Sequence, residues 1–61
     1  MKHAQAEYIN LGYKYEKATN ANSARAVAET LRHMIQSEHV TEQIDARYFI
    51  ERGRQEARTG L

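Results

Sequence analysis

Large apolar side chains are scarce in this chain, and that scarcity limits what it can fold into. Only twelve of its 61 residues are Ile, Leu, Val, Met or Phe, whereas nine are Ala and four are Tyr. A domain of this length buries only about 60% of the surface that its unfolded chain exposes, so its stability is marginal. The sequence has no Cys, which removes disulfides and thiolate zinc sites as a source of stability. We therefore expect one small domain over residues 1–61, stabilised as a homodimer or by a protein partner.

The charge and hydropathy of the chain exclude several other classes of protein. Nine Lys and Arg against eight Asp and Glu leave a net charge of +1, without the basic excess of general polyanion binders. No apolar run approaches the roughly 20 residues that cross a bilayer, and no apolar block of a signal peptide follows residues 1–4. We expect a cytoplasmic protein that has no membrane partner.

Apolar residues recur at three- and four-residue steps in three segments of the chain, which is the spacing of a helical face. This periodicity predicts helices over residues 4–18, 23–38 and 42–58, with a loop at 19–22 and a break at 39–40. The middle segment is the most amphipathic of the three. Its stripe contains Ala24, Val27, Ala28, Leu31, Met34, Ile35 and Glu38.

The ends of these helices carry residue types that favour helix termini. Asn22 or Ser23 is a candidate N-cap for the second helix, and Thr41 is one for the third. Gly60 is expected to end the third helix. An alternative stays open for residues 9–15, where apolar and polar residues alternate as they do in a strand.

The predicted fold is all-α, with the first two helices forming an antiparallel hairpin through their short loop. The third helix packs either on this hairpin or on that of a neighbouring subunit. The expected core combines aromatic and aliphatic residues from all three helices. It contains Tyr8, Leu11, Tyr15, Val27, Leu31, Met34, Ile35, Phe49 and Ile50.

The first and third helices each have a second apolar patch away from the expected core. Ile9 and Tyr13 form one patch, and Ile44 and Tyr48 form the other. A three-helix monomer would leave these patches in water, so we interpret them as a dimer or partner surface. In the alternative interpretation, the two Tyr rings lie flat on the surface with their hydroxyls in water.

Four residues of the first segment, Tyr8, Leu11, Gly12 and Tyr15, follow the pattern Tyr-x-x-Leu-Gly-x-x-Tyr. This pattern resembles the first helix of a tetratricopeptide repeat. The resemblance implies that Gly12 lets a second helix approach closely, with the flanking rings packed around the contact.

The resemblance covers residues 8–28 at best. Ala24 stands where the repeat has a small residue, but Ala28 replaces its usual bulky aromatic. The chain has no Pro to close the repeat, and Glu42 and Asp45 stand where a second copy needs apolar residues. The resemblance therefore implies a close-packed helical hairpin and does not assign the chain to the family.

The sequence contains no pattern of residues typical of catalysis or metal binding. His3, His33 and His39 are not spaced to share one helical face, whereas a metal site needs several converging ligands. The carboxylates are scattered among Lys and Arg, and no Gly-rich elbow surrounds Ser23 or Ser37. We expect a protein that is not an enzyme and that has no cofactor and no metal.

The third helix carries the only basic stripe, which contains Arg47, Arg54 and Arg58. Arginine suits phosphate and base-edge contacts, so the stripe supports a nucleic-acid hypothesis with this helix in the major groove. A ribbon-helix-helix dimer with residues 9–15 as its strand is a second version. Against the first version, Arg47 and Glu51 are spaced to form an ordinary helix-surface ion pair. Against the second, Glu16 would face phosphates, and residues 4–18 follow a helical pattern.

The function that the sequence favours is a small helical protein–protein interaction module that forms a homodimer. Its predicted surface contains Ile9, Tyr13, Ile44 and Tyr48. The alternative is a small DNA- or RNA-binding regulator that uses the arginine stripe.

Overall fold

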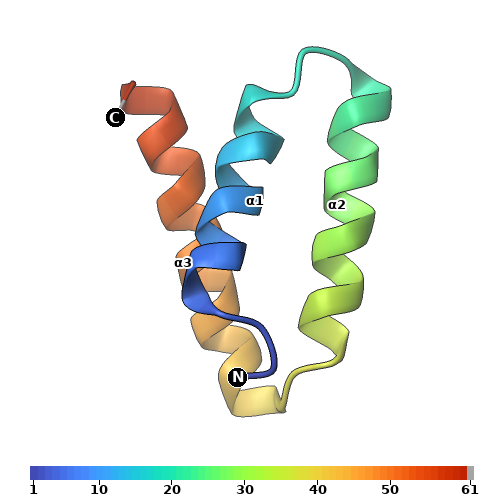
Figure 1. The fold of residues 1–61 in the computed structure, drawn as a ribbon, viewed down its shortest axis with the longest axis vertical. Coiled ribbons are helices and arrows are strands. Elements are labelled where there is room, and N and C mark those ends of the chain that lie inside the picture. The colour runs from blue at the N-terminus through green and yellow to red at the C-terminus, as the bar shows by residue number, and fades with distance from the viewer. Residues whose placement is uncertain (61) are drawn as a thin grey trace.

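The computed structural model describes residues 1–60, which form three helices. They are α1 (Gln5–Lys17), α2 (Ala21–Gln36) and α3 (Val40–Thr59) (Figure 1). The predicted all-α class with three helices is confirmed. No strand occurs among the described residues, so the strand alternative for 9–15 is wrong, and so is the ribbon-helix-helix arrangement that needs it.

The three helices form a flat body with α1 at its centre. The Cα atoms extend over 31 × 24 × 14 Å. The chain runs along α1, returns along α2, and then runs back along α3, which crosses behind α1 (Figure 1). α1 packs mainly on α3 and less closely on α2, while α2 and α3 touch each other at few positions. The third helix therefore packs on the first helix of its own chain.

Two helices begin earlier than their sequence patterns predict, because the capping residues differ. The N-cap of α2 is Asn20, whose Oδ1 accepts a hydrogen bond from the Ser23 backbone N–H at 2.8 Å. The N-cap of α3 is His39, and Thr41 already lies within the helix. Asn20 and His39 have extended backbones, as an N-cap requires. Gly60 ends α3, as predicted, and adopts the left-handed conformation.

Two glycines allow α1 and α3 to cross with their backbones in contact. A Cβ on Gly12 would overlap the carbonyl oxygen of Ile50, and a Cβ on Gly53 would overlap that of Ile9. The Gly53 Cβ would also lie 2.9 Å from the Tyr13 backbone nitrogen, whereas non-bonded heavy atoms prefer roughly 3.5–4.0 Å. Gly12 thus admits a close helix, but that helix is α3 rather than the next one in the chain.

The hydrophobic core lies where α2 meets the α1–α3 pair. Its centre contains Tyr8, Leu31, Met34 and Ala46, and half-buried residues pack around it: Leu11, Val27, Ile35, Phe49 and Ile50. This confirms eight of the nine predicted core residues. The ninth, Tyr15, is half-buried beside the groove described below. Ala46, which the predicted core list does not contain, is completely buried in the core cluster.

One carboxylate, that of Glu38, is buried just after α2, with only 5% of its residue surface exposed. It accepts hydrogen bonds from the Tyr8 hydroxyl at 2.7 Å and from the backbone N–H groups of Lys2 at 2.7 Å and His3 at 3.1 Å. Every polar atom of the carboxylate is therefore satisfied, as a buried charge requires. Through these hydrogen bonds, the Glu38 carboxylate connects Lys2 and His3, which precede α1, to the end of α2.

These hydrogen bonds set the pKa values of both side chains. Burial acts to raise the pKa of Glu38, but the hydrogen bonds from Tyr8, Lys2 and His3 outweigh it and lower the pKa to about 2. Burial, followed by the hydrogen bond to Glu38, raises the pKa of the Tyr8 phenol well above its ordinary value. The folded state therefore favours an ionised Glu38 beside a neutral Tyr8.

The lowered pKa of Glu38 predicts a loss of stability in acid. The pKa of Glu38 is about 2 in the folded state, below the ordinary value of 4.5. The contribution of Glu38 to the free energy of unfolding is therefore present above pH 4.5 and is lost as the pH falls toward 2. The urea concentration at the unfolding midpoint, measured between pH 7 and pH 2.5, should fall as the pH drops below about 4.5. The Tyr8→Phe variant lacks one of the hydrogen bonds that lower the pKa of Glu38, so its urea midpoint should fall less over the same pH range. Equal pH profiles for the two proteins would contradict the assignment.

Candidate interaction surface

An apolar stripe on α3 is the most exposed hydrophobic feature of the molecule. It consists of Val40, Ile44 and Tyr48, which we call the α3 stripe, and these residues are 70%, 67% and 65% exposed. Steps of four residues place them on one side of the helix. The Tyr48 ring packs edge-on against Phe49, with 5.3 Å between ring centroids, so the stripe is partly ordered by the core beneath it.

The four residues that the sequence assigned to one surface lie in different surroundings. Ile44 and Tyr48 are exposed on the α3 stripe, whereas Ile9 and Tyr13 are half-buried. The Ile9 carbonyl and the Tyr13 nitrogen lie against Gly53 in the helix crossing. Lys17 lies over the Tyr13 ring, with its ammonium 5.8 Å from the ring centroid. The structure thus adds Val40 to the exposed set and places the α1 patch at the crossing.

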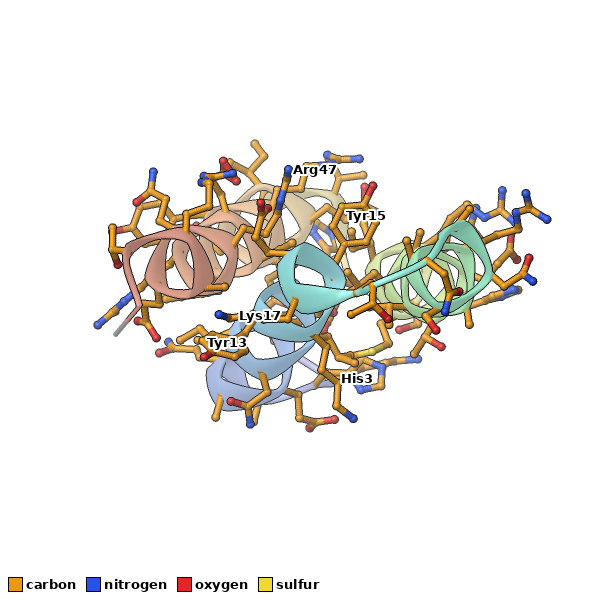
Figure 2. The ribbon with its side chains drawn as sticks, turned by 90° about the horizontal axis from the view of Figure 1, so that it is seen from above. His3, Tyr13, Tyr15, Lys17 and Arg47 are labelled. Atoms are coloured by element: carbon orange, nitrogen blue, oxygen red, sulfur yellow. The ribbon has the colours of Figure 1, made fainter. Side chains whose placement is uncertain are left out.

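A groove lies between α2 and α3, because α1 keeps these two helices apart. Its volume is about 400 Å³. Apolar residues from all three helices line it: Tyr15, Ala28, Leu31, Ile35 and Ile50. Its polar lining consists of Arg32, Gln36, Gln43, Arg47 and Arg54. Figure 2 shows Tyr15 and Arg47 on the same side of the molecule, with Tyr13 and His3 on the opposite side.

The three arginines of the predicted basic stripe separate into a pair and a single residue. Arg54 donates to Glu16 at 3.0 Å, and Arg58 donates to Glu16 at 3.3 Å and to Glu51 at 3.2 Å. The hydrogen bond to Glu16 raises the pKa of the Arg54 guanidinium. Arg47 is exposed and lines the groove.

These ion pairs change what the arginine stripe can do. Arg54 and Arg58 connect α3 to α1 through Glu16, so their charges are already matched by carboxylates. The predicted partner of Arg47, Glu51, pairs instead with Arg58 and, at 3.7 Å, with Arg54. The sequence spacing did not show the connection to α1, because Glu16 is far away along the chain.

Other kinds of site receive no support from the described residues. Among residues 1–60, no group of three or more His, Cys, Asp or Glu side chains is placed to hold a metal ion. Within the same part of the chain, no helix combines the length and the apolar character that crossing a membrane requires.

Reasoning from the sequence missed Val40 and the α2–α3 groove. The signal for Val40 was present, since it lies four residues before Ile44, but it fell in the predicted break between helices. The groove had no local signal because its lining comes from three helices.

No protein-family model matches this chain, and neither a curated protein nor a solved structure matches it.

Proposed function

We propose that this chain is a non-enzymatic helical interaction module that self-associates through the α3 stripe. The observation that carries the proposal is the exposure of Val40, Ile44 and Tyr48 by about two thirds on one side of a helix. An exposed apolar row of this kind indicates an interaction site on a small protein. The scarcity of large apolar residues adds weight, because three of those among residues 1–60 are exposed rather than used in the core: Met1, Val40 and Ile44.

The stripe is suited to pairing with a second copy of itself. Val40 and Tyr48 lie four residues to either side of Ile44, so the row is centred on Ile44. If two α3 helices pack antiparallel about a twofold axis at Ile44, Val40 of one copy lies beside Tyr48 of the other. The same patch then serves both subunits, as in the isologous interface of a twofold dimer.

The nucleic-acid alternative has less support from the geometry. Glu16 and Glu51 pair with two of the three arginines that would contact phosphates. A mixed-sequence DNA duplex would test this alternative directly, because phosphate-driven binding weakens steeply as salt rises. Self-association through an apolar stripe should persist or strengthen slightly under the same change.

Sedimentation equilibrium of the wild-type chain and of the double variant Ile44→Ser/Tyr48→Ser tests the proposal. We expect the wild type to dimerise and the variant to have a dissociation constant at least about 100-fold higher, since each copy loses two buried apolar side chains. Both residues are mostly exposed in the monomer, so the far-UV circular dichroism of the variant should remain helical.

The matched control is Lys14→Ser/Arg25→Ser, which changes two exposed positions on α1 and α2. Its dissociation constant should equal that of the wild type. A monomeric wild-type chain, or a double variant that dimerises as tightly as the wild type, would refute self-association through the α3 stripe.

A further inference from the structure

The groove between α2 and α3 has an apolar floor that the fold leaves open. Leu31 is nearly buried, and Ile35 and Ile50 are half-buried beside it. Ala28 lies one turn before Leu31 on the α2 wall and has too small a side chain to cover the floor. The volume of about 400 Å³ lies within the roughly 300–1,000 Å³ of ordinary ligand pockets.

The charged lining of the groove has one sign. Arg32, Arg47 and Arg54 line it together with two glutamines, and no Asp or Glu is part of that lining. Arg32 pairs with Glu29 at 2.7 Å and Arg54 with Glu16 at 3.0 Å, both carboxylates outside the lining. Within residues 1–60, no carboxylate makes an ion pair with Arg47. Arg47 therefore presents an uncompensated cation on the α3 wall.

We propose that this groove binds an amphipathic helix of a partner protein whose apolar face is flanked by carboxylates. Two helices that flank an apolar floor provide the geometry of helix-in-groove recognition. In this arrangement, apolar anchors of the partner contact Leu31, Ile35 and Ile50, and a carboxylate of the partner pairs with Arg47. The site is separate from the α3 stripe and does not depend on self-association.

The charge of the groove selects this occupant over a second copy of the chain. On α3 the exposed apolar row of this chain has charges of both signs beside it, because Glu51 and Arg52 adjoin Tyr48. A second copy would therefore bring a cation as well as a carboxylate to a cationic groove. Like charges brought together at an interface are unfavourable, whereas complementary charges favour the encounter and set its orientation. An acidic partner helix supplies the complementary charge.

Two synthetic peptides of about 14 residues, or four helical turns, provide the probes. Both carry leucines at positions i, i+4, i+7 and i+11, and the flanking positions are Glu in one peptide and Lys in the other. Fluorescence anisotropy should show that the acidic peptide binds at least tenfold more tightly than the basic one. When the acidic peptide binds, the amide chemical shifts of the protein should change at Leu31, Ile35 and Ile50, and not at Ile44 and Tyr48.

Variants of the protein then locate the binding site. Arg47→Glu should weaken binding of the acidic peptide at least tenfold, and Ala28→Glu, which adds a carboxylate inside the groove, should do the same. The matched control is Arg25→Glu, an exposed arginine of α2 outside the lining, which should change the affinity less than twofold. Binding should persist in Ile44→Ser/Tyr48→Ser, which separates this site from the dimer surface.

Several results would overturn the proposal. They are equal affinity for the two peptides, an Arg25→Glu effect as large as that of Arg47→Glu, and shift changes confined to the α3 stripe. Tighter binding of a DNA duplex than of the acidic peptide, lost steeply with salt, would also overturn it and would assign the groove arginines to phosphate contacts.

Discussion

Gly53→Ala is expected to unfold the chain. The added Cβ would overlap the Ile9 carbonyl oxygen and lie 2.9 Å from the Tyr13 nitrogen. Both neighbours are backbone atoms of α1, so no side-chain rotation can make room, and the two helices must separate. Separation breaks the contact between Gly12 and Ile50 as well, because the same crossing contains both glycines. We expect a loss greater than the roughly 1–3 kcal/mol typical of an overpacked core.

The expected stability of the whole chain makes this loss decisive. A chain of 61 residues has an unfolding free energy of roughly 3–9 kcal/mol. Alanine is a better helix former than glycine by only about 1 kcal/mol, which does not offset the clash. Thermal unfolding followed by far-UV circular dichroism should show little or no cooperative transition for Gly53→Ala.

Gly60→Ala is the control for this experiment because it adds the same methyl group to open space. Gly60 has a φ of 80°, and apart from its own atoms and its chain neighbours, no heavy atom of the described residues lies within 4 Å of the position of its Cβ. The cost should be only the roughly 1–2 kcal/mol of placing an L-residue in the left-handed region. If Gly53→Ala unfolds with the midpoint of the wild type, the helix crossing is not as close as described.

Glu38→Gln is expected to produce the second-largest loss of stability. One carboxylate oxygen accepts from Lys2, and the other accepts from both His3 and Tyr8. An amide has only one accepting oxygen, so its NH₂ group must face at least one of these donors. A buried donor without an acceptor is strongly unfavourable. We expect the melting temperature to fall by about 10 °C, given the small unfolding entropy of a chain this short.

The control for Glu38→Gln is Glu29→Gln, which removes an exposed carboxylate that pairs with Arg32 on the surface of α2. Exposed ion pairs contribute little, so its melting temperature should stay near that of the wild type. Equal melting temperatures for the two variants would show that the buried hydrogen bonds of Glu38 do not stabilise the fold.

The close crossing of α1 and α3 also explains why apolar side chains remain at the surface. Gly12 and Gly53 lie in this crossing, and Ala46 and Ala57 are buried on α3. Small residues bring the backbones together without using large side chains. Large apolar residues elsewhere on α3 then have no third layer to cover them. Val40, Ile44 and Tyr48 are exposed, so α3 has one face packed in the fold and another face open.

Local patterns in the sequence were enough to predict the helices and most of the core. Steps of three and four residues determine which side of each helix is apolar, and this depends only on the helical repeat. The same pattern placed Ile44 and Tyr48 away from the core face. It also placed Glu38 on the apolar stripe of the second segment, although the sequence did not indicate which groups would donate hydrogen bonds to its carboxylate there.

The tertiary structure alone decided which helices pack together and which charges are matched. Gly12 marks a close approach, but the sequence does not say whether the approaching helix is α2 or α3. Glu16 pairs with Arg54, Tyr8 binds Glu38, and the groove assembles around Arg47 only after the chain has folded back on itself. Contacts between residues 30 or more positions apart leave no periodic trace in a single sequence, because periodicity records the face of one helix and not the partner against which that face packs.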